Sequence, residues 1–175
     1  MQRSIILAGL MALTAGPTLA GEVEDLMKQG QGSLNRFDYR GAISAYDQAL
    51  EVDPDNAMTL NSRCWARALW NNELREAQRD CDRSLYLKPY NAATLNTRGF
   101  LDYRQGNFKA SIDDYTKSIK LNWQNASSFY MRGQAYLKVG DTMHAKFDFM
   151  KASELDPAIK VKYSKYSIPW PPISL

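Results

Sequence analysis

Residues 40–56 read "RGAISAYDQALEVDPDN", a stretch with helical periodicity that ends in a turn of aspartate, proline and asparagine. The same pattern returns as "REAQRDCDRSLYLKPYN" at 75–91, "KASIDDYTKSIKLNWQN" at 109–125 and "HAKFDFMKASELDPAI" at 144–159. The spacing is about 34 residues, and a fixed spacing of this size indicates a repeat architecture. Each copy follows another helical stretch, so we expect four helical hairpins, over residues 23–56, 57–91, 92–125 and 126–159.

Small residues occupy matching places in the two helices of each hairpin, and an aromatic residue follows in most second helices. The first helices carry Gly30, Cys64, Gly99 and Gly133; the second carry Ala42, Ala77, Ser111 and Ala145, followed by Tyr46, Cys81, Tyr115 and Phe149. A small residue where two helices cross lets them approach closely, and an aromatic ring fills the wider gap beside it.

In these positions residues 23–159 resemble the tetratricopeptide repeat family, although Trp123 stands where the other units have an exit proline. The resemblance implies an all-α fold in which hairpins stack into a short right-handed superhelix, with a concave face made of first helices. An irregular helical bundle is the alternative.

The first twenty residues differ from the rest. Arg3 is their only charge, an apolar run covers residues 5–13, and Gly16-Pro17 precedes Thr18-Leu19-Ala20. This order is typical of a secretory signal peptide, so we expect residues 1–20 to be removed after Ala20 and the protein to be periplasmic or secreted. No cysteine lies near Ala20 to accept a lipid, so no stable membrane anchor is expected after cleavage. A buried or membrane-anchoring N-terminal helix is the alternative.

Three arginines recur together with three aspartates. Arg63, Arg98 and Arg132 occupy one place in the first helices of units two to four, and Asp80, Asp114 and Asp148 occupy the facing place in the second helices. Unit one has Gln29 and Ala45 there instead. The joint presence predicts a structural ion pair inside each hairpin. A ladder of ligand-facing arginines is the alternative.

The two cysteines are predicted to face each other across the second hairpin, because Cys64 and Cys81 are equally far from its turn. A disulfide there would persist in an oxidising compartment. Two buried thiols are the alternative, since helix spacing must suit disulfide geometry.

Composition excludes several classes of function. The formal net charge of +3 is too small for a nucleic-acid footprint. His144 is the only histidine and no nucleophile motif accompanies it, so we expect a solvated histidine, no enzyme, no cofactor and no metal site.

The remaining feature is a binding surface. First-helix residues that point away from the second helices should line the groove: Met27, Gln31, Asn61, Trp65, Leu69, Asn96, Phe100, Tyr103, Arg104, Tyr130, Gln134, Leu137 and Lys138. Aromatic anchors beside amides suit a peptide or protein segment. Some of these rings, Trp65 and Phe100 above all, would instead pack between units.

The family's carboxylate clamp of lysine, arginine and asparagine looks absent, since its places hold Met27, Gln31, Ser62, Ala93, Thr97, Ser127 and Met131. The resemblance therefore implies a protein-interaction scaffold without a particular partner. A structural protein that associates with itself is the alternative.

The last stretch, residues 160–175, has two interpretations. It caps unit four through Val161, Tyr163 and Trp170, or its "PWPPISL" end is a polyproline II ligand for a partner or for the groove of a second copy.

Overall fold

The protein is described by a computed structural model that covers residues 18–164, 166, 168 and 171. No strand occurs in this part of the chain. Its helices are α1 (Leu19–Asn35), α2 (Tyr39–Val52), α3 (Ala57–Trp70), α4 (Leu74–Leu87), α5 (Ala92–Gln105), α6 (Phe108–Leu121), α7 (Ala126–Lys138), α8 (Thr142–Leu155) and α9 (Ile159–Ser164).

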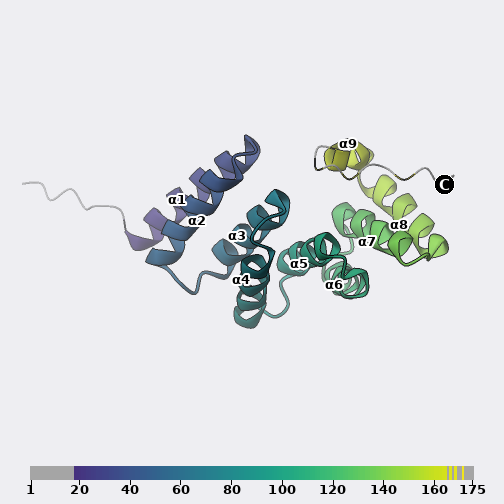
Figure 1. The fold of residues 1–175 in the computed structure, drawn as a ribbon, viewed down its shortest axis with the longest axis horizontal. Coiled ribbons are helices and arrows are strands. Elements are labelled where there is room, and N and C mark those ends of the chain that lie inside the picture. The colour runs from purple at the N-terminus through teal and green to yellow at the C-terminus, as the bar shows by residue number, and fades with distance from the viewer. Residues whose placement is uncertain (1–17, 165, 167, 169–170, 172–175) are drawn as a thin grey trace, which may run out of the picture.

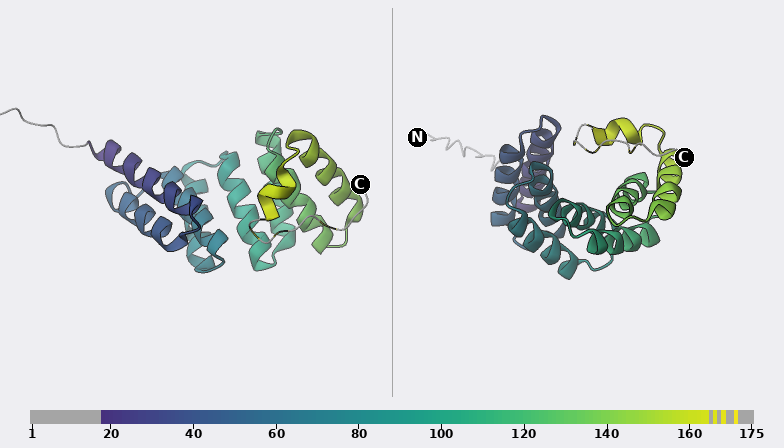
Figure 2. Two further views of the ribbon diagram at one scale, coloured as in Figure 1. Left: turned by 90° about the horizontal axis from the view of Figure 1, so that it is seen from above. Right: turned by 45° about the vertical axis from the view of Figure 1, so that its right-hand side comes forward.

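Helices α1 to α8 form four hairpins that stack in chain order along an arc (Figures 1 and 2). The first helices α1, α3, α5 and α7 lie on the inner side of the arc, and the second helices lie outside. The predicted all-α solenoid is therefore confirmed. None of the helices in the described residues has both the length and the apolar composition of a membrane span.

Asparagines of the exit turns begin the next first helix. The side chain of Asn56 accepts a hydrogen bond from the Thr59 amide at 3.1 Å, and Asn91 and Asn125 cap α5 and α7 in the same way. Such caps satisfy amides that have no partner within the helix. They explain why each turn is followed at once by a new helix.

Helix α1 begins earlier than the predicted first unit. Thr18 caps it, with its hydroxyl oxygen accepting from the Gly21 amide at 3.2 Å, so Leu19 and Ala20 are helical. The predicted cleavage point after Ala20 therefore falls inside the first turn of α1. Residues 1–17 of the expected signal peptide lie outside the described residues.

The small crossing residues allow close contact inside the hairpins. A Cβ atom added to Gly30 would lie 2.3 Å from the Tyr46 ring, and one added to Gly99 would lie 3.1 Å from the Tyr115 ring. Both rings are almost fully buried. The aromatic ring of the second helix therefore occupies the space that a larger first-helix residue would need.

The second hairpin uses a disulfide at the same place. Cys64 and Cys81 are bonded, with their Cα atoms 5.6 Å apart, and both are fully buried. Each cysteine stands where another hairpin has its glycine or its aromatic ring. A covalent link thus replaces the glycine–ring contact in unit two.

Each repeated arginine makes two kinds of contact. Arg98 binds Asp114 of its own hairpin through Nε and Nη2, at 2.6 and 3.0 Å, and binds Asp82 of the preceding hairpin through Nη1 at 2.8 Å. Arg63 joins Asp80 and Asp47 in this way, and Arg132 joins Asp148 and Thr116. The arginines therefore connect neighbouring units as well as the two helices of one unit.

This arrangement accounts for the exceptions at both ends of the stack. Unit one has Gln29 at the arginine place, and the described residues contain no earlier unit whose acceptor an arginine could bind. At the other end, Met150 stands where Asp47, Asp82 and Thr116 accept from the next unit, and no repeat follows it in the described chain.

Asp102 is a buried carboxyl beside the third of these clusters. It lies one turn after Arg98 on α5 and is 8% exposed. Burial raises the pKa of Asp102 to about 6, and the charge of Asp114 adds to the rise, while Asn107 and Arg98 oppose it. In unit two the equivalent residue is Arg67, which binds Asp80. Unit three therefore has one cation fewer for its buried carboxyls.

Candidate functional site

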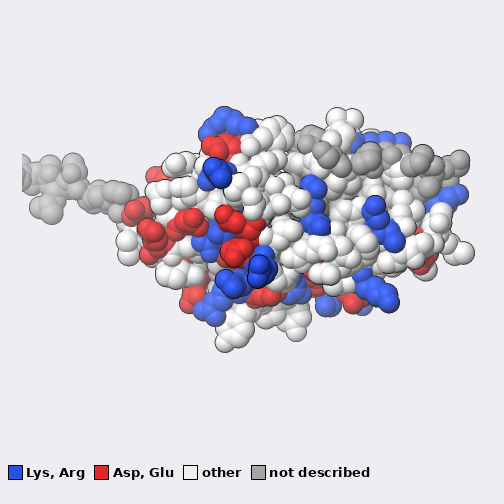
Figure 3. Space-filling model, in the orientation of Figure 1, with Lys and Arg blue, Asp and Glu red and all other residues white. Residues whose placement is uncertain are grey.

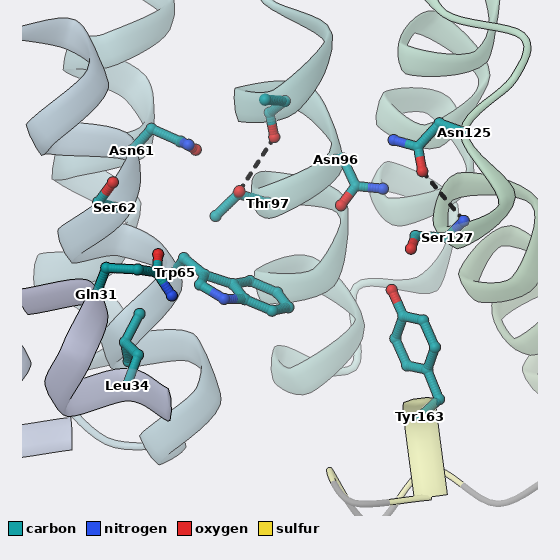
Figure 4. Close-up of a pocket in the computed structure, with 11 residues that line it drawn as sticks. Gln31, Leu34, Asn61, Ser62, Trp65, Asn96, Thr97, Asn125, Ser127 and Tyr163 are labelled. Atoms are coloured by element: carbon teal, nitrogen blue, oxygen red, sulfur yellow. Dashed lines mark hydrogen bonds between the residues drawn. The ribbon is translucent and has the colours of Figure 1, made fainter. Parts of the chain in front are cut away.

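A hollow of about 300 Å³ lies on the concave face (Figure 4). Residues from four first helices and one tyrosine of α9 line it: Gln31, Leu34, Asn61, Ser62, Trp65, Ala93, Asn96, Thr97, Asn125, Ser127 and Tyr163. None of these side chains carries a formal charge at neutral pH. The hollow is therefore a polar but uncharged site built by the repeats.

Trp65 and Leu34 supply the apolar part of this surface. Trp65 is partly exposed, and its ring packs on Phe100 with centroids 4.9 Å apart. Figure 4 shows the indole lying across the hollow, between the amides of α1 and α5. A large ring held in place from behind loses little freedom when a partner covers it.

Asn61 and Asn96 supply the amides predicted for the groove. The Nδ2 of Asn96 donates to Ser128 at 2.8 Å, which fixes the orientation of that amide. The Oδ1 of Asn61 is buried and has no hydrogen-bond partner within the described part of the chain.

Five of the seven places of the family's carboxylate clamp lie on this surface, and Met27 and Met131 do not line it. Gln31, Ser62, Ala93, Thr97 and Ser127 all line the hollow and hold no cation. The side chains in these places could accept or donate hydrogen bonds, except Ala93. They would not neutralise a carboxylate.

Several residues predicted to line an open groove are buried instead. Phe100, Tyr130 and Gln134 are 1%, 0% and 7% exposed, and Leu69 is also buried in the core. Tyr130 is covered by the chain beyond α8, which folds back over the concave side of units three and four (Figure 2): its ring packs on Tyr163 and its hydroxyl donates to the Ile168 carbonyl. Phe100 packs between units against Trp65, as the alternative interpretation had it. None of the four is open to solvent in this structure.

The other predicted groove residues have different surroundings. Tyr103 packs its ring against Phe108, and Arg104 lies over the Phe100 ring at 5.1 Å and donates to the Tyr166 carbonyl at 3.1 Å. Met27 and Leu137 pack against the core, and Lys138 is exposed at the end of α7. None of these five lines the hollow.

The capping segment also differs from expectation. Tyr163 is buried, but Val161 is 74% exposed and covers nothing. Ile159 and Ile168, which the sequence did not single out, are buried instead. Trp170 and most of "PWPPISL" lie outside the described residues.

The face of the molecule shown in Figure 3 carries charges of both signs. Asp and Glu gather over the N-terminal hairpins in Figure 3, interspersed with Lys and Arg. His144 is exposed and its Nδ1 lies 2.7 Å from Asp141. No group of three or more His, Cys, Asp or Glu side chains suited to a metal ion occurs in the residues that the structure covers.

Comparison with known proteins agrees with the repeat architecture. A family model described as TPR repeat matches residues 99–140, and one described as tetratricopeptide repeat matches residues 126–159. Among solved structures, the chain is similar to Pseudomonas aeruginosa pilF, with a TM-score of 0.72 and 20% identity over 85% of this chain and 68% of that one. MamA from Desulfovibrio magneticus gives a TM-score of 0.67 and 18% identity over 78% and 76%.

The curated relatives are longer than this chain, so the similarity covers only part of each of them. Protein SGT1 homolog of Bos taurus is 27% identical over 90% of this chain, but over only 44% of its own length. Small glutamine-rich tetratricopeptide repeat-containing protein 2 of Saccharomyces cerevisiae is 28% identical over 63% of this chain and 32% of its own. The chain thus spans less than half the length of these relatives. The second TPR domain of human RPAP3, solved in complex with the HSP70 peptide SGPTIEEVD, matches with a TM-score of 0.61 and 19% identity over 67% of this chain and 98% of that one.

Proposed function

The chain is a tetratricopeptide repeat protein, and on that premise we propose that it is a protein-interaction scaffold that binds an extended peptide segment in the hollow of its concave face. Trp65 is the anchor for an apolar side chain of the partner. Asn61 and Asn96 hydrogen-bond the partner's main chain. The observation that carries the proposal is Trp65, a large and partly exposed ring held against Phe100 in a hollow lined by uncharged amides and hydroxyls.

The chemistry of the lining limits the kind of peptide. The RPAP3 domain was solved with a peptide that ends in Glu-Glu-Val-Asp. The hollow of this chain has no lysine or arginine in its lining to pair with such acids. We therefore propose an uncharged or apolar segment as the partner, recognised by amide hydrogen bonds and by Trp65.

A displayed library of random peptides tests this proposal. Full-length protein with its disulfide intact is the target, and the affinities of the selected peptides are then measured by fluorescence anisotropy. Trp65→Ala and Asn61→Ala should each weaken binding by about tenfold or more, because both remove a contact in the centre of the site. Lys109→Glu is the matched control, since Lys109 is exposed on the outer helix α6 and should leave affinity unchanged.

Helix content and melting temperature must be compared first, because Trp65 also packs on Phe100. Equal affinity of the selected peptides for wild type and for both folded variants would show that the hollow is not the binding site.

We further propose that residues 1–20 are an export signal and that the mature protein works in an oxidising compartment. The order of charge, apolar run and small residues supports export. The bonded Cys64–Cys81 pair supports the compartment. Mass spectrometry of protein from the cell envelope should find Gly21 at the N-terminus. Recovery of chains that still begin at Met1, from the reducing interior alone, would contradict export.

A further inference from the structure

The chain beyond α8 folds back into the same groove. Helix α9 lies across the mouth of the arc in Figure 2, and its contacts are to α7 and α8. Tyr163 packs on Tyr130 with ring centroids 4.7 Å apart, and Tyr166 packs on Trp65 at 6.1 Å. The segment therefore reaches from unit four to unit two along the concave face.

The groove holds this segment by its main chain. Arg104 donates from Nη2 to the Tyr166 carbonyl at 3.1 Å, and the Tyr130 hydroxyl donates to the Ile168 carbonyl at 3.2 Å. Gln134 donates to the Tyr130 oxygen at 3.1 Å and so orients that hydroxyl. Side-chain donors from two first helices that grip alternate carbonyls are a common means of holding an extended peptide.

The segment covers more than the end of the stack. Tyr163 and Ile168 are buried against Tyr130 of unit four. Beyond them, the Tyr166 carbonyl accepts from Arg104 of unit three, and the Tyr166 ring packs on Trp65 of unit two. An end cap alone would contact only the last unit.

We infer that residues 159–168 are an internal ligand of the groove, which an external segment of the same chemistry displaces. This inference rests on the proposed function, because it assigns the closed part of that groove, which residues 159–168 cover, to the same kind of partner. The partner carries two aromatic side chains and an aliphatic one, spaced as Tyr163, Tyr166 and Ile168 are, and presents two main-chain carbonyls to Arg104 and Tyr130.

Tyr163 lies between the closed part of the groove and the open hollow. It is buried against Tyr130 and also forms one wall of the open hollow, where Ser127 lies beside it (Figure 4). A segment that enters the hollow therefore meets the internal ligand. Release of residues 159–168 frees Arg104 of unit three and Tyr130 of unit four for a partner, and so extends the accessible groove beyond the hollow.

A synthetic, fluorescently labelled peptide of residues 159–171 is the probe, and the full-length chain is the receptor. Ile168→Asp places a charge at a buried contact and should loosen the internal segment. The labelled peptide should then bind this variant at least about tenfold more tightly than wild type, because it no longer competes with a tethered copy. Val161→Asp is the matched control, since Val161 is exposed on the same segment.

Two further measurements decide the interpretation. Arg104→Ala added to Ile168→Asp should remove most of the gained affinity, because the peptide loses its carbonyl contact. If Ile168→Asp keeps the melting temperature of wild type but binds the peptide no more tightly, the segment is not a displaceable ligand. No unidentified partner enters this test, so it can succeed even if the open hollow binds nothing.

Hydrogen exchange of the wild-type chain covers the case in which Ile168→Asp does not fold. The amides of Tyr166 and Ile168 both donate to the Tyr163 carbonyl. In an internal ligand they should exchange at least about tenfold faster than the amides of α7, through local opening. Exchange at the same slow rate as α7 would mean that the segment opens only when the whole protein unfolds, and would overturn the inference.

Discussion

Arg98→Ala is the substitution that best tests how the repeats are held together. It removes both hydrogen bonds to Asp114, whose side chain is only 5% exposed, and the single bond to Asp82, whose side chain is 52% exposed. Breaking a buried pair by deleting one partner costs about 3–5 kcal/mol. Lys117 lies 3.6 Å from Asp114 and offsets part of the loss. We therefore expect the free energy of unfolding to fall by about 3 kcal/mol.

The two contacts of Arg98 should differ in strength. Asp82→Ala removes only exposed contacts, to Arg98 and to Gln78, and should cost about 1 kcal/mol or less. A double-mutant cycle of Arg98 with Asp114 should give a coupling energy of about 2 kcal/mol, and a cycle with Asp82 about 0.5 kcal/mol. Urea unfolding followed by far-ultraviolet circular dichroism measures all four quantities, without reductant, so that the disulfide stays closed.

The reasoning fails if the two cycles give equal coupling energies. It also fails if Arg98→Ala costs less than Asp82→Ala, because the buried carboxylate would then not depend on its arginine.

Three other substitutions or treatments follow from single features of the fold. Asp102→Asn should remove one pH-dependent contribution to stability. The folded pKa is near 6 and the ordinary value is 3.8, so the unfolded chain releases this proton first, and the contribution of Asp102 to stability falls by about 3 kcal/mol as pH rises through that window. The stability of the variant relative to wild type should therefore rise between pH 3.5 and 7, as measured by urea midpoints. Reduction of Cys64–Cys81 should lower the free energy of unfolding by about 3 kcal/mol, measured by urea unfolding with and without reductant, and an unchanged midpoint would contradict it. Gly30→Ala should lower the melting temperature by several degrees, since its Cβ would lie 2.3 Å from the Tyr46 ring, whereas an unchanged melting curve would mean that α1 and α2 shift apart without cost.

Much of the repeat architecture could be predicted because its causes recur. Gly99 with Tyr115, and Arg98 with Asp114, appear in phase with their counterparts in other units, so comparison of units identifies each contact. The inter-unit contact was missed, although the column of Asp47, Asp82 and Thr116 was a signal for it. This contact joins two neighbouring units, whereas each predicted pair lies within one unit.

The closed part of the groove, which residues 159–168 cover, could not be predicted in this way. Tyr130 and Arg104 are bound to carbonyls of residues 166 and 168, and a main-chain carbonyl is the same whatever the residue. The segment has no counterpart in the repeats to compare it with. First-helix positions alone therefore placed the Tyr130 ring in the groove, without indicating that the returning chain covers it.

The ladder of arginines gives the stack an uneven response to salt. Arg63 reaches a carboxylate of unit one and Arg98 reaches one of unit two, but Arg132 reaches only the neutral hydroxyl of Thr116. Added salt screens attraction between exposed charges and hardly affects a neutral hydrogen bond. We therefore expect the contacts between units one and two and between units two and three to weaken as ionic strength rises, while the contact between units three and four changes little.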